Sequence, residues 1–388
     1  MDVAIVGSGI AGLSAAVALR RVGIQASVYE RAPELREVGA GISLWANALR
    51  ALDYIGAGEA VRRASLHISQ FELRTNEGRR IRMGLDAKMV EQQFGIPEYA
   101  RMIHRADLVA AIASHLPTDS MHFGYECTAI DNLDSHVRLH FDNRQTRDVD
   151  LVIGADGIRS VVRDAVQGKQ EPRYSGYTCW RGICPRPASI EVGYVGEWWG
   201  RGKRFGITTI PDDRIYWFAV ENAQEGMQWP DERERLLATF AGWADPCPDL
   251  IDSTPTDRIL RNDIHDRKPN PTWSKGRVGI IGDAAHSTTP NLGQGGCMAI
   301  EDAAVLARQV KAHSDPAEAW VAFTNERYRH TSAIVRDSWT FGRIAQKEGR
   351  VTCWLRDVAI GLSARLLSPT SLLKYVMHDV GPLTTSAE

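Results

Sequence analysis

The first thirty residues alternate between short apolar runs and one amphipathic stretch. The β-branched run VAIVG begins at Val3, LSAAVALRRVG has helical periodicity that ends at Gly23, and QASVYE closes on an acid at Glu30. Short apolar runs bounded by turn residues predict strands, and apolar positions three and four residues apart predict a helix. We therefore predict a β-α-β unit at the start of the chain.

The pattern changes in the middle of the chain and then returns. A helix is predicted over residues 102–116, with Arg105 just ahead of it or in its first turn, and HVRLHF and DVDLVIG are predicted strands. From about Tyr174, short aromatic runs are separated by Gly, Pro and Asp, which is typical of an antiparallel sheet. A helix is predicted after Pro230, and RVGII is a second predicted buried strand of the kind seen at the start of the chain. The pattern predicts an α/β domain interrupted by a β-rich block.

Composition and charge exclude several classes of protein. The 46 basic and 48 acidic residues give a net charge of -2, so no overall field favours nucleic acid or an anionic membrane. The six cysteines contain no C-x-x-C pair and have no partnering His cluster, so we expect neither a metal site nor a disulfide framework. No leader precedes VAIVG, and the most apolar late segment carries Arg356, Asp357 and Arg365, which argues against a membrane span. We expect a cytoplasmic protein.

A G-x-G-x-x-G motif lies at the first predicted strand-to-helix turn. Gly7 permits the tight turn, Gly9 lets the backbone approach a pyrophosphate, and Gly12 lets the helix pack close to the sheet. Glu30, at the end of the next strand, can accept a hydrogen bond from a ribose hydroxyl and disfavours a 2′-phosphate. The motif predicts a site for FAD or NAD, and a glycine-rich turn without a ligand is the alternative.

Two further turns follow predicted strands. GADGIRSVVR contains Asp156, although an Asp-Gly turn followed by a helix cap at Ser160 explains it equally well. GDAAHSTTPNLGQGG combines Asp283 with a second glycine cluster. Asp283 can accept from a polyol hydroxyl, and the exposed amides of a helix beginning near Gly295 can face a ring that gains negative charge. A reduced flavin is such a ring, which favours FAD.

The motifs GSGIAG with its downstream acid, GADGIRS and GDAAHSTTPNLGQGG resemble, in this order, those of the single-component FAD-dependent aromatic hydroxylases, the para-hydroxybenzoate hydroxylase class. The resemblance covers residue 1 to about 340. Further segments are similar to bacterial FAD-dependent urate hydroxylases and to the zeaxanthin-epoxidase-like branch: CWRG at 179–182, GKRFGI at 202–207, IYWFA at 215–219 and HDRKP at 265–269.

The resemblance implies tightly but non-covalently bound FAD and assigns its contacts by position. The turn around Ala11 meets the phosphates, Glu30 and Arg31 meet the adenosine, Ser43 lies near the flavin end, and Arg105 contacts the ribityl–phosphate region.

Other implied FAD contacts come from later in the chain. Cys127 contributes its backbone to the adenine, and Asp156 assists both FAD and nicotinamide binding. With Asp283, a run of loop residues holds the ribityl chain and the ring: Pro290, Gly293, Gln294, Gly295, Gly296 and Cys297. His286 looks like a base, but a hydrogen-bonded structural role is preferred.

The implied reaction needs no separate nicotinamide domain, and no second G-x-G-x-x-G follows a strand after residue 12. NADH or NADPH docks transiently and reduces FAD, and O₂ then gives a flavin C4a-hydroperoxide that hydroxylates an electron-rich ring. The expected substrate is a small aromatic or heteroaromatic molecule of the phenol or urate type. The alternatives are an epoxidase or hydroxylase of a larger polycyclic, antibiotic-like substrate, and a non-catalytic flavin-fold binding protein.

The urate-hydroxylase resemblance also implies two substrate residues. Arg204 would stabilise a deprotonated ring by its opposite charge, and Tyr216 would orient the ring by a hydrogen bond. If the loop PDDR (211–214) has an even length, the two side chains lie on opposite faces of the hairpin, whereas an odd loop or a bulge puts them on the same face.

The predicted fold is a Rossmann-type FAD-binding domain of the GR2-like flavoprotein class with an inserted antiparallel substrate domain. Residues 1–171 form the first part of the FAD-binding domain, with small β excursions, and 172–270 form the substrate domain; 271–340 complete the FAD-binding domain, and 341–388 form a C-terminal helical segment. This last segment is apolar-striped around Trp354, Leu362 and Leu366. We expect it to pack on its own domain rather than cover the site or form a dimer face, and the chain to be a monomer or a homodimer.

Overall fold

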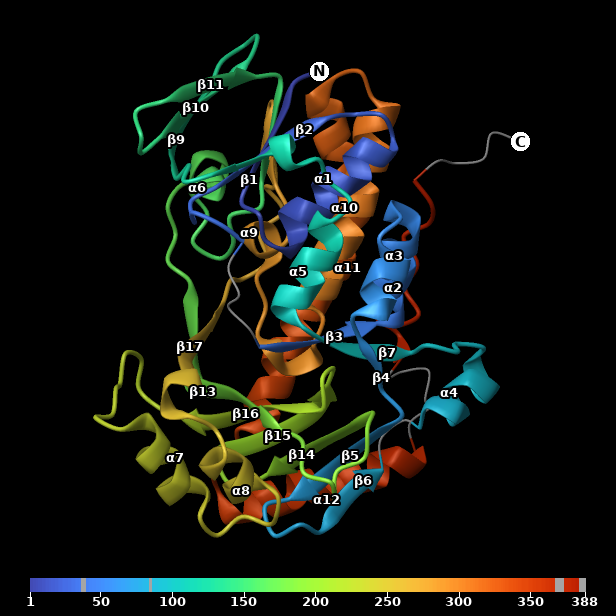
Figure 1. Cartoon of the computed structure of the whole chain (residues 1–388), viewed down its shortest axis with the longest axis vertical. Helices are drawn as coiled ribbons and strands as arrows, with labels where there is room; N and C mark the ends of the chain where they lie inside the picture. The colour runs from blue at the N-terminus through green and yellow to red at the C-terminus, as the bar shows by residue number, and fades with distance from the viewer. Residues whose placement is uncertain (36–39, 84–85, 367–372, 384–388) are drawn as a thin grey trace.

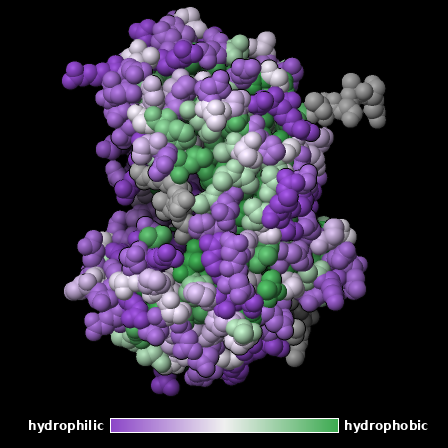
Figure 2. All heavy atoms as spheres, in the orientation of Figure 1, coloured by the Kyte–Doolittle hydropathy of each residue, from purple (hydrophilic) through white to green (hydrophobic). Residues whose placement is uncertain are grey.

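The computed structural model describes residues 1–35, 40–83, 86–366 and 373–383. An α/β half contains the N-terminus and the long central helices, and the other half is built on a broad sheet (Figure 1). Hydrophobic residues on the viewed face gather around the middle of the molecule, where the two halves meet (Figure 2). The predicted combination of an α/β domain with an inserted sheet domain is confirmed.

A mostly parallel sheet forms the centre of the α/β half. In order across the sheet its strands are β18 (Ser274–Lys275), β19 (Val278–Ile280), β12 (Leu151–Gly154), β1 (Val3–Val6), β2 (Ala26–Glu30) and β8 (Met121–Phe123). β1 pairs in parallel with both β2 and β12, and β12 pairs in parallel with β19. The carboxyl ends of these strands therefore share one edge of the sheet, which is where open α/β sheets bind ligands.

Helices are present in both halves, and several of them surround this sheet. They are α1 (Ile10–Arg21), α2 (Ala46–Ile55), α3 (Gly58–Arg63), α4 (Ala87–Phe94), α5 (Arg105–Ala113), α6 (Val161–Gln167), α7 (Glu232–Phe240), α8 (Cys247–Asp252), α9 (Asp283–His286), α10 (Gly295–Ala312), α11 (Pro316–Ala345) and α12 (Arg350–Leu366). Single 3₁₀ turns are η1 (Thr118–Ser120), η2 (Thr256–Arg258) and η3 (Pro290–Leu292). α1 and α10 run side by side along the central sheet, and their inner faces join its strands in one apolar core (Figure 1).

Two small sheets flank the α/β half. One consists of β9 (Cys127–Asn132), β10 (Val137–Phe141) and β11 (Thr146–Val149), and the other of β3 (Gly41–Trp45), β7 (Ala100–His104) and β4 (Leu66–His67). The predicted helix over 102–116 begins only at Arg105, because the preceding residues pair with β3 as strand β7. Pairing with a distant strand thus overrides local helical periodicity at this boundary.

The broad sheet has the order β17 (Leu260–Asp266), β13 (Arg173–Pro185), β16 (Arg214–Asn222), β15 (Lys203–Ile210), β14 (Tyr194–Trp199), β5 (Gln70–Thr75) and β6 (Arg80–Met83). The range 172–270 supplies β13 to β17, as the aromatic strand pattern predicts. β5 and β6 come from within the range 1–171, and β5 joins the sheet by parallel pairing with β14.

Several large aromatic residues of the broad sheet lie on the face that α7 and α8 cover. Trp180, Phe205 and Trp217 form one core with Leu236 and Phe240 of α7. The indole NH of Trp217 donates to the Thr254 hydroxyl at 2.8 Å. Alternation along the strands leaves the opposite face of the sheet for the α/β half.

Two of the chain crossings between the halves are held together by an ion pair with a buried carboxylate. Arg173, at the start of β13, donates to both carboxylate oxygens of Asp266, at the end of β17, at 2.8 and 2.7 Å. Asp266 is fully buried, and the Arg173 guanidinium lies over the ring of Trp339 on α11. Bidentate pairing with a planar guanidinium fixes orientation as well as charge, so the broad sheet has a defined direction relative to α11.

The C-terminal helix α12 packs along β6 at the outer edge of the broad sheet (Figure 1). Ile360 joins Leu73 and Trp199 in a small cluster there, while Trp354 and Leu362 face solvent. The side chain of Leu366 lies outside the described residues. In the described part of the chain, no helix is both long enough and apolar enough to cross a membrane.

Gly182 tests the packing of the broad sheet. A Cβ atom on Gly182 would overlap the fully buried ring of Trp217. We expect Gly182→Ala to lower the free energy of unfolding by about 1–3 kcal/mol, as overpacking does. Urea denaturation of the protein measures this change.

Gly242→Ala is the matched control, because nothing lies within 4 Å of a Cβ atom there. It should leave stability unchanged or raise it by up to about 1 kcal/mol. Equal midpoints for Gly182→Ala and the wild type would contradict the packing described above.

Candidate cofactor and substrate site

The turns after β1, β12 and β19 meet at the carboxyl edge of the central sheet. Gly7 has a φ of +103°, and a Cβ atom on it would lie 2.6 Å from the carbonyl oxygen of Ala155, next to Asp156. Gly282 has a φ of +57°, and its Cβ position lies 2.7 Å from the Cβ of Ala11. Positive φ together with close contact at both places requires glycine. The three motifs found in the sequence thus form one site.

The N-terminus of α1 is open towards this site. A Cβ atom on Gly12 would overlap the carbonyl oxygen of Gly7, whereas nothing lies within 4 Å of the Cβ position of Gly9. No side chain caps the helix at Gly9, and its first turn contains no acid. The free amide groups of this first turn are suited to a phosphate. Gly12 is explained by the protein's own packing, whereas the open space at Gly9 leaves room for a ligand.

Glu30 is fixed by the turn that it faces. One carboxylate oxygen accepts from the backbone NH and the hydroxyl of Ser8, both at 2.9 Å, and the other accepts from the NH of Ala32 at 2.9 Å. Burial alone would raise the pKa of Glu30, but these hydrogen bonds outweigh burial and lower it. A carboxylate has about four acceptor positions, so one remains for a ribose hydroxyl.

Asp156 combines a structural contact with a free acceptor. One of its carboxylate oxygens accepts from the NH of Val161 at 2.7 Å and so caps α6 together with Ser160. The other, Oδ1, is buried and has no hydrogen-bond partner among the described residues. Burial raises the pKa of Asp156. An orphaned buried acceptor beside Gly7 is a place for a ligand donor.

The loop from Asp283 to Gly296 presents backbone and one carboxylate. Asp283 is exposed, and its side chain has no hydrogen bond or ion pair within the part of the chain that the structure describes. η3 begins at the exposed Pro290, and Gly293 ends it with a φ of +62°. No side chain caps α10 at Gln294, so the amides of Gly295 and the next residues are open. The loop therefore offers a second set of amide donors beside an acid.

The two predicted cysteines contribute no reactive thiolate. Burial raises the pKa of both Cys127 and Cys297 to about 12. The Cys297 thiol lies 3.7 Å from the carbonyl oxygen of Ser43 and 3.6 Å from that of Gly293. Both are neutral at physiological pH, which leaves their backbone groups for a ligand.

A buried charge network, which the sequence pattern did not predict, holds the start of this loop on α10 and α11. Asp302 of α10 accepts from the Gly282 NH at 3.0 Å, from His286 at 2.6 Å and from Arg327 of α11 at 2.8 Å. Burial would raise the pKa of Asp302, but His286 and Arg327 hold it well below its usual range. His286 is buried and contacts Asp302, which agrees with the structural role preferred for it. The acid pair Glu301–Asp302 inside an apolar helix was the available signal.

Strand β3 connects the loop to the start of α5. The Cβ position of Gly293 lies 2.6 Å from the Ser43 hydroxyl, so Ser43 adjoins the loop. Arg105 begins α5, and its NH donates to the Ala40 carbonyl at 3.0 Å. The side chains of Arg105 and Arg31 are exposed and make no ion pair among the described residues.

Arg204 and Tyr216 lie on the same face of the broad sheet. β15 and β16 pair with Ile210 opposite Arg214, so the connecting loop has three residues, and Asp212 and Asp213 adopt positive φ. Tyr216 is opposite Thr208, and Arg204 is opposite Val220. Cross-strand partners share a face, and four residues along a strand separate the two side chains by ~13 Å. They can contact opposite ends of a ligand but not each other.

Arg204 is buried and its nitrogens already have partners. Nε donates to Gln346 at 2.9 Å, Nη2 donates to Asn291 at 2.7 Å, and Nη1 lies 3.3 Å from the Glu197 carboxylate. Asn291 belongs to η3 and also donates to the Tyr177 hydroxyl at 3.0 Å. Arg204 therefore joins the broad sheet to the loop that carries Gly293 to Gly296.

Tyr216 lies where the two halves meet. A Cβ atom on Gly41 would lie 2.5 Å from the Tyr216 ring, so the ring packs on the start of β3. The ring belongs to a hydrophobic cluster between the two halves. The members of this cluster include Ile183, Val195, Ile210 and Phe218 of the broad sheet, Trp45, Tyr99, Ala100 and Met102 beside it, and Leu373 and Val376 near the C-terminus. Burial raises the pKa of Tyr216 to about 12, and Arg181 partly opposes this rise. The hydroxyl is thus a neutral hydrogen-bond donor.

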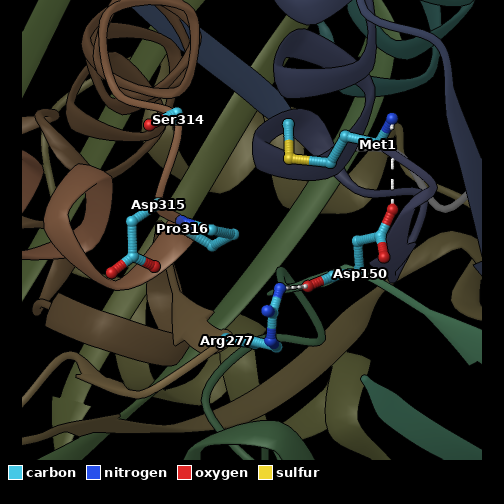
Figure 3. Close-up of a pocket in the computed structure, with 6 residues that line it drawn as sticks. All are labelled: Met1, Asp150, Arg277, Ser314, Asp315 and Pro316. Atoms are coloured by element: carbon cyan, nitrogen blue, oxygen red, sulfur yellow. Dashed lines mark hydrogen bonds and ion pairs between the residues drawn. The ribbon is translucent and has the colours of Figure 1, made fainter. Parts of the chain in front are cut away.

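A surface pocket of about 490 Å³ lies elsewhere and is not this site (Figure 3). It is lined by Met1, Asp150 and Arg277, each just before a strand of the central sheet, and by Ser314, Asp315 and Pro316. These residues mark the amino ends of the strands. Ligands of open parallel sheets bind at the opposite, carboxyl ends.

The residues at the carboxyl edge suit FAD. Gly9 leaves space that no protein atom fills, Asp156 has an orphaned acceptor, and Asp283 has a free carboxylate. Two uncapped helix N-termini supply amides at two separate places. A dinucleotide with an extended polyol chain can use all of these groups, whereas a mononucleotide can use only part of them.

Comparison with known proteins agrees with this geometry. Residues 1–338 match the family described as "FAD binding domain". The chain is 40% identical over 360 residues to the aurachin C monooxygenase/isomerase of Stigmatella aurantiaca, covering 92% of this chain and 93% of the relative. It is 36% identical over 332 residues to an FAD-dependent urate hydroxylase of Mycolicibacterium vanbaalenii, covering 83% of this chain and 82% of the relative. The structure of Klebsiella pneumoniae HpxO with FAD and uric acid superposes with a TM-score of 0.90 at 28% identity, covering 99% of this chain and 98% of that one.

The Gly9→Ala variant distinguishes an effect on FAD binding from an effect on protein stability. The φ of Gly9 is −72°, which alanine adopts without strain, and no protein atom meets the added Cβ. We expect the free energy of unfolding of the FAD-free protein to change by less than about 1 kcal/mol. The affinity for FAD should fall at least ~10-fold, which corresponds to about 1.4 kcal/mol.

Fluorescence titration of FAD-free protein with FAD, together with urea denaturation, makes both measurements. Gly242→Ala is again the matched control and should bind FAD like the wild type. Unchanged FAD affinity in Gly9→Ala would show that the first turn is not the phosphate site.

Proposed function

This chain belongs to the family of FAD-dependent monooxygenases, and we propose that it uses NADH or NADPH and O₂ to hydroxylate a small aromatic or heteroaromatic substrate. The contact between Arg204 and Asn291 carries this proposal. It ties the inserted sheet to the loop of Gly293–Gly296, so a substrate bound on the sheet lies beside the flavin end of the cofactor. The names of the two relatives, which act on aurachin C and on urate, support a ring containing nitrogen.

FAD bound at the carboxyl edge supplies the activation of O₂ and the transfer of one oxygen atom, chemistry that side chains cannot provide. The protein's own groups bind and orient. In this proposal Glu30 accepts from the ribose, the amides of the first turn of α1 meet the phosphates, and Asp283 accepts from the ribityl chain. The amides at Gly295 stabilise negative charge on the ring system.

Tyr216 orients the substrate ring in this proposal. Its hydroxyl stays protonated over the physiological pH range because burial raises its pKa to about 12. A neutral donor held against Gly41 has little freedom to move, so it can select one edge of a ring. The surrounding apolar cluster keeps water away from the reacting carbon.

The partners of Arg204 favour a substrate with little formal charge. The Glu197 carboxylate lies 3.3 Å from Arg204, so the guanidinium charge is already balanced inside the protein. An anionic ring would have to compete with Glu197, whereas a neutral heteroaromatic ring would not. Arg204 then acts mainly by holding Asn291 and the loop.

A substrate screen tests the proposal. Oxidation of NADH and NADPH is followed with urate, salicylate, hydroxybenzoates, 4-quinolones and larger polycyclic phenols, and hydroxylated product is measured directly, because uncoupled peroxide release also consumes NAD(P)H. Product with one or more of these rings supports the proposal. A protein that binds FAD but makes no product with any of them would favour a non-catalytic role.

The Arg204→Ala variant tests whether hydroxylation needs the contact between Arg204 of the broad sheet and Asn291 of the loop. We expect FAD to remain bound, because Arg204 lies outside the three turns that form its site, and the product formed per NAD(P)H consumed to fall at least ~10-fold. Because the substitution leaves Glu197 unpaired, the double variant Arg204→Ala/Glu197→Gln is measured beside it. Arg138→Ala, which removes an exposed arginine of β10, is the control. Normal hydroxylation by both Arg204 variants would contradict the proposed role.

Tyr216→Phe tests the orienting hydroxyl. It removes one donor and leaves the ring that packs on Gly41, so the fold and FAD content should not change. We expect kcat/KM to fall about 10-fold, the cost of one lost hydrogen bond. Tyr54→Phe removes a hydroxyl that contacts Asp379, away from the broad sheet, and should have the activity of the wild type. Equal kcat/KM values in Tyr216→Phe and Tyr54→Phe would show that the Tyr216 hydroxyl does not orient the substrate.

A further inference from the structure

Helix α12 exposes its apolar side chains instead of burying them. Five large hydrophobic residues on it are between 39% and 68% exposed, and we name them the apolar stripe: Val351, Trp354, Leu355, Val358 and Leu362. At about 100° per residue these positions lie within an arc of roughly 100° on one side of the helix. The stripe is therefore a continuous face, unlike scattered single hydrophobic residues, which are normal on surfaces.

The opposite side of α12 is anchored to the protein through different groups. Arg356 is buried and donates to the carbonyl oxygen of Ala345 at 2.8 Å, and its guanidinium lies over the ring of Trp199. Cys353 is buried, and Gly361 packs against the backbone of Ile81. The helix is thus held in place without its apolar stripe, which is left for a second surface.

Three cations precede the stripe in the chain. Arg343, Lys347 and Arg350 are exposed and form no ion pair within the part of the chain that the structure describes. The acid at this corner is Glu348, which accepts from Asn222 at 2.6 Å. Asp357, farther along the helix, is paired with Arg356 at 2.8 Å. The corner is therefore net positive and complements a negatively charged surface.

The size of the stripe argues against a second copy of the chain. α12 is about 25 Å long, and one stripe of one helix buries far less than the roughly 1,600 Å² of a standard protein interface. A lipid bilayer needs no matching shape and accepts a helix that lies flat with its apolar face in the acyl boundary and cations at the headgroups. Trp354 in the middle of the stripe suits this boundary.

We propose that α12 docks the protein onto the surface of a membrane containing anionic lipids. The apolar stripe enters the boundary between headgroups and acyl chains, and Arg343, Lys347 and Arg350 bind the headgroups. The chain lies on the bilayer and does not cross it, since no described helix could span one. Because α12 packs on β6, docking brings the broad sheet close to the membrane (Figure 1).

Vesicle flotation of the FAD-loaded protein tests this proposal. Phosphatidylcholine vesicles are used with and without phosphatidylglycerol, and we expect binding to the anionic vesicles that weakens as salt is added. Trp354→Gln/Leu355→Gln should bind at least ~10-fold more weakly because it removes buried apolar area. Arg350→Gln should bind about 5-fold more weakly. Val321→Gln removes an equally exposed hydrophobic residue of α11 and should bind like the wild type.

Visible absorption of bound FAD and thermal unfolding show whether each variant is folded, and all should match the wild type because the replaced side chains face solvent. The proposal is overturned if the wild type does not float with anionic vesicles, or if the double variant floats as well as the wild type. A dimer in gel filtration that depends on the stripe, with no flotation, would overturn it as well and assign the stripe to a second copy.

Discussion

Close contact between backbone turns is the constraint on which the site depends. The turn after β1 touches the turn after β12 at Gly7, and the turn after β19 touches the start of α1 at Gly282. A side chain at either position would push the strand ends apart, so the glycines are required by the protein before any ligand is considered. Gly9 differs, because no protein atom lies within 4 Å of a Cβ atom there, so that its packing does not require glycine.

Buried charges then fix the parts that the turns alone cannot hold. Asp302 gathers the Gly282 amide, His286 and Arg327, and so joins α10, α11 and the second glycine loop. Arg173 and Asp266 set the direction of the inserted sheet. Each of these charges is paired, since an unpaired charge at such depth would cost several kcal/mol. The result is a cofactor loop and a substrate face held at a defined separation.

Local patterns in the sequence were sufficient to predict the β-α-β unit, the aromatic β-rich block and the three glycine turns, because each is encoded within a short window. Features that depend on distant pairing were not predictable. β5 and β6 join a sheet whose other strands lie a hundred residues later, and β7 replaces the first turn of the expected helix. The three-residue loop that puts Arg204 and Tyr216 on one face depends on positive φ at two aspartates, which their residue type permits but does not require.

Hydrogen–deuterium exchange of the FAD-free protein with and without added FAD shows whether one FAD molecule contacts all three turns. If one FAD molecule spans the three turns, the amides of residues 7–12, 156–162 and 283–297 should all become protected at the same FAD concentration. Protection confined to residues 7–12, with unchanged exchange in the loop after β19, would contradict this prediction. A dinucleotide would then bind the first turn without reaching the loop proposed to contact the flavin ring.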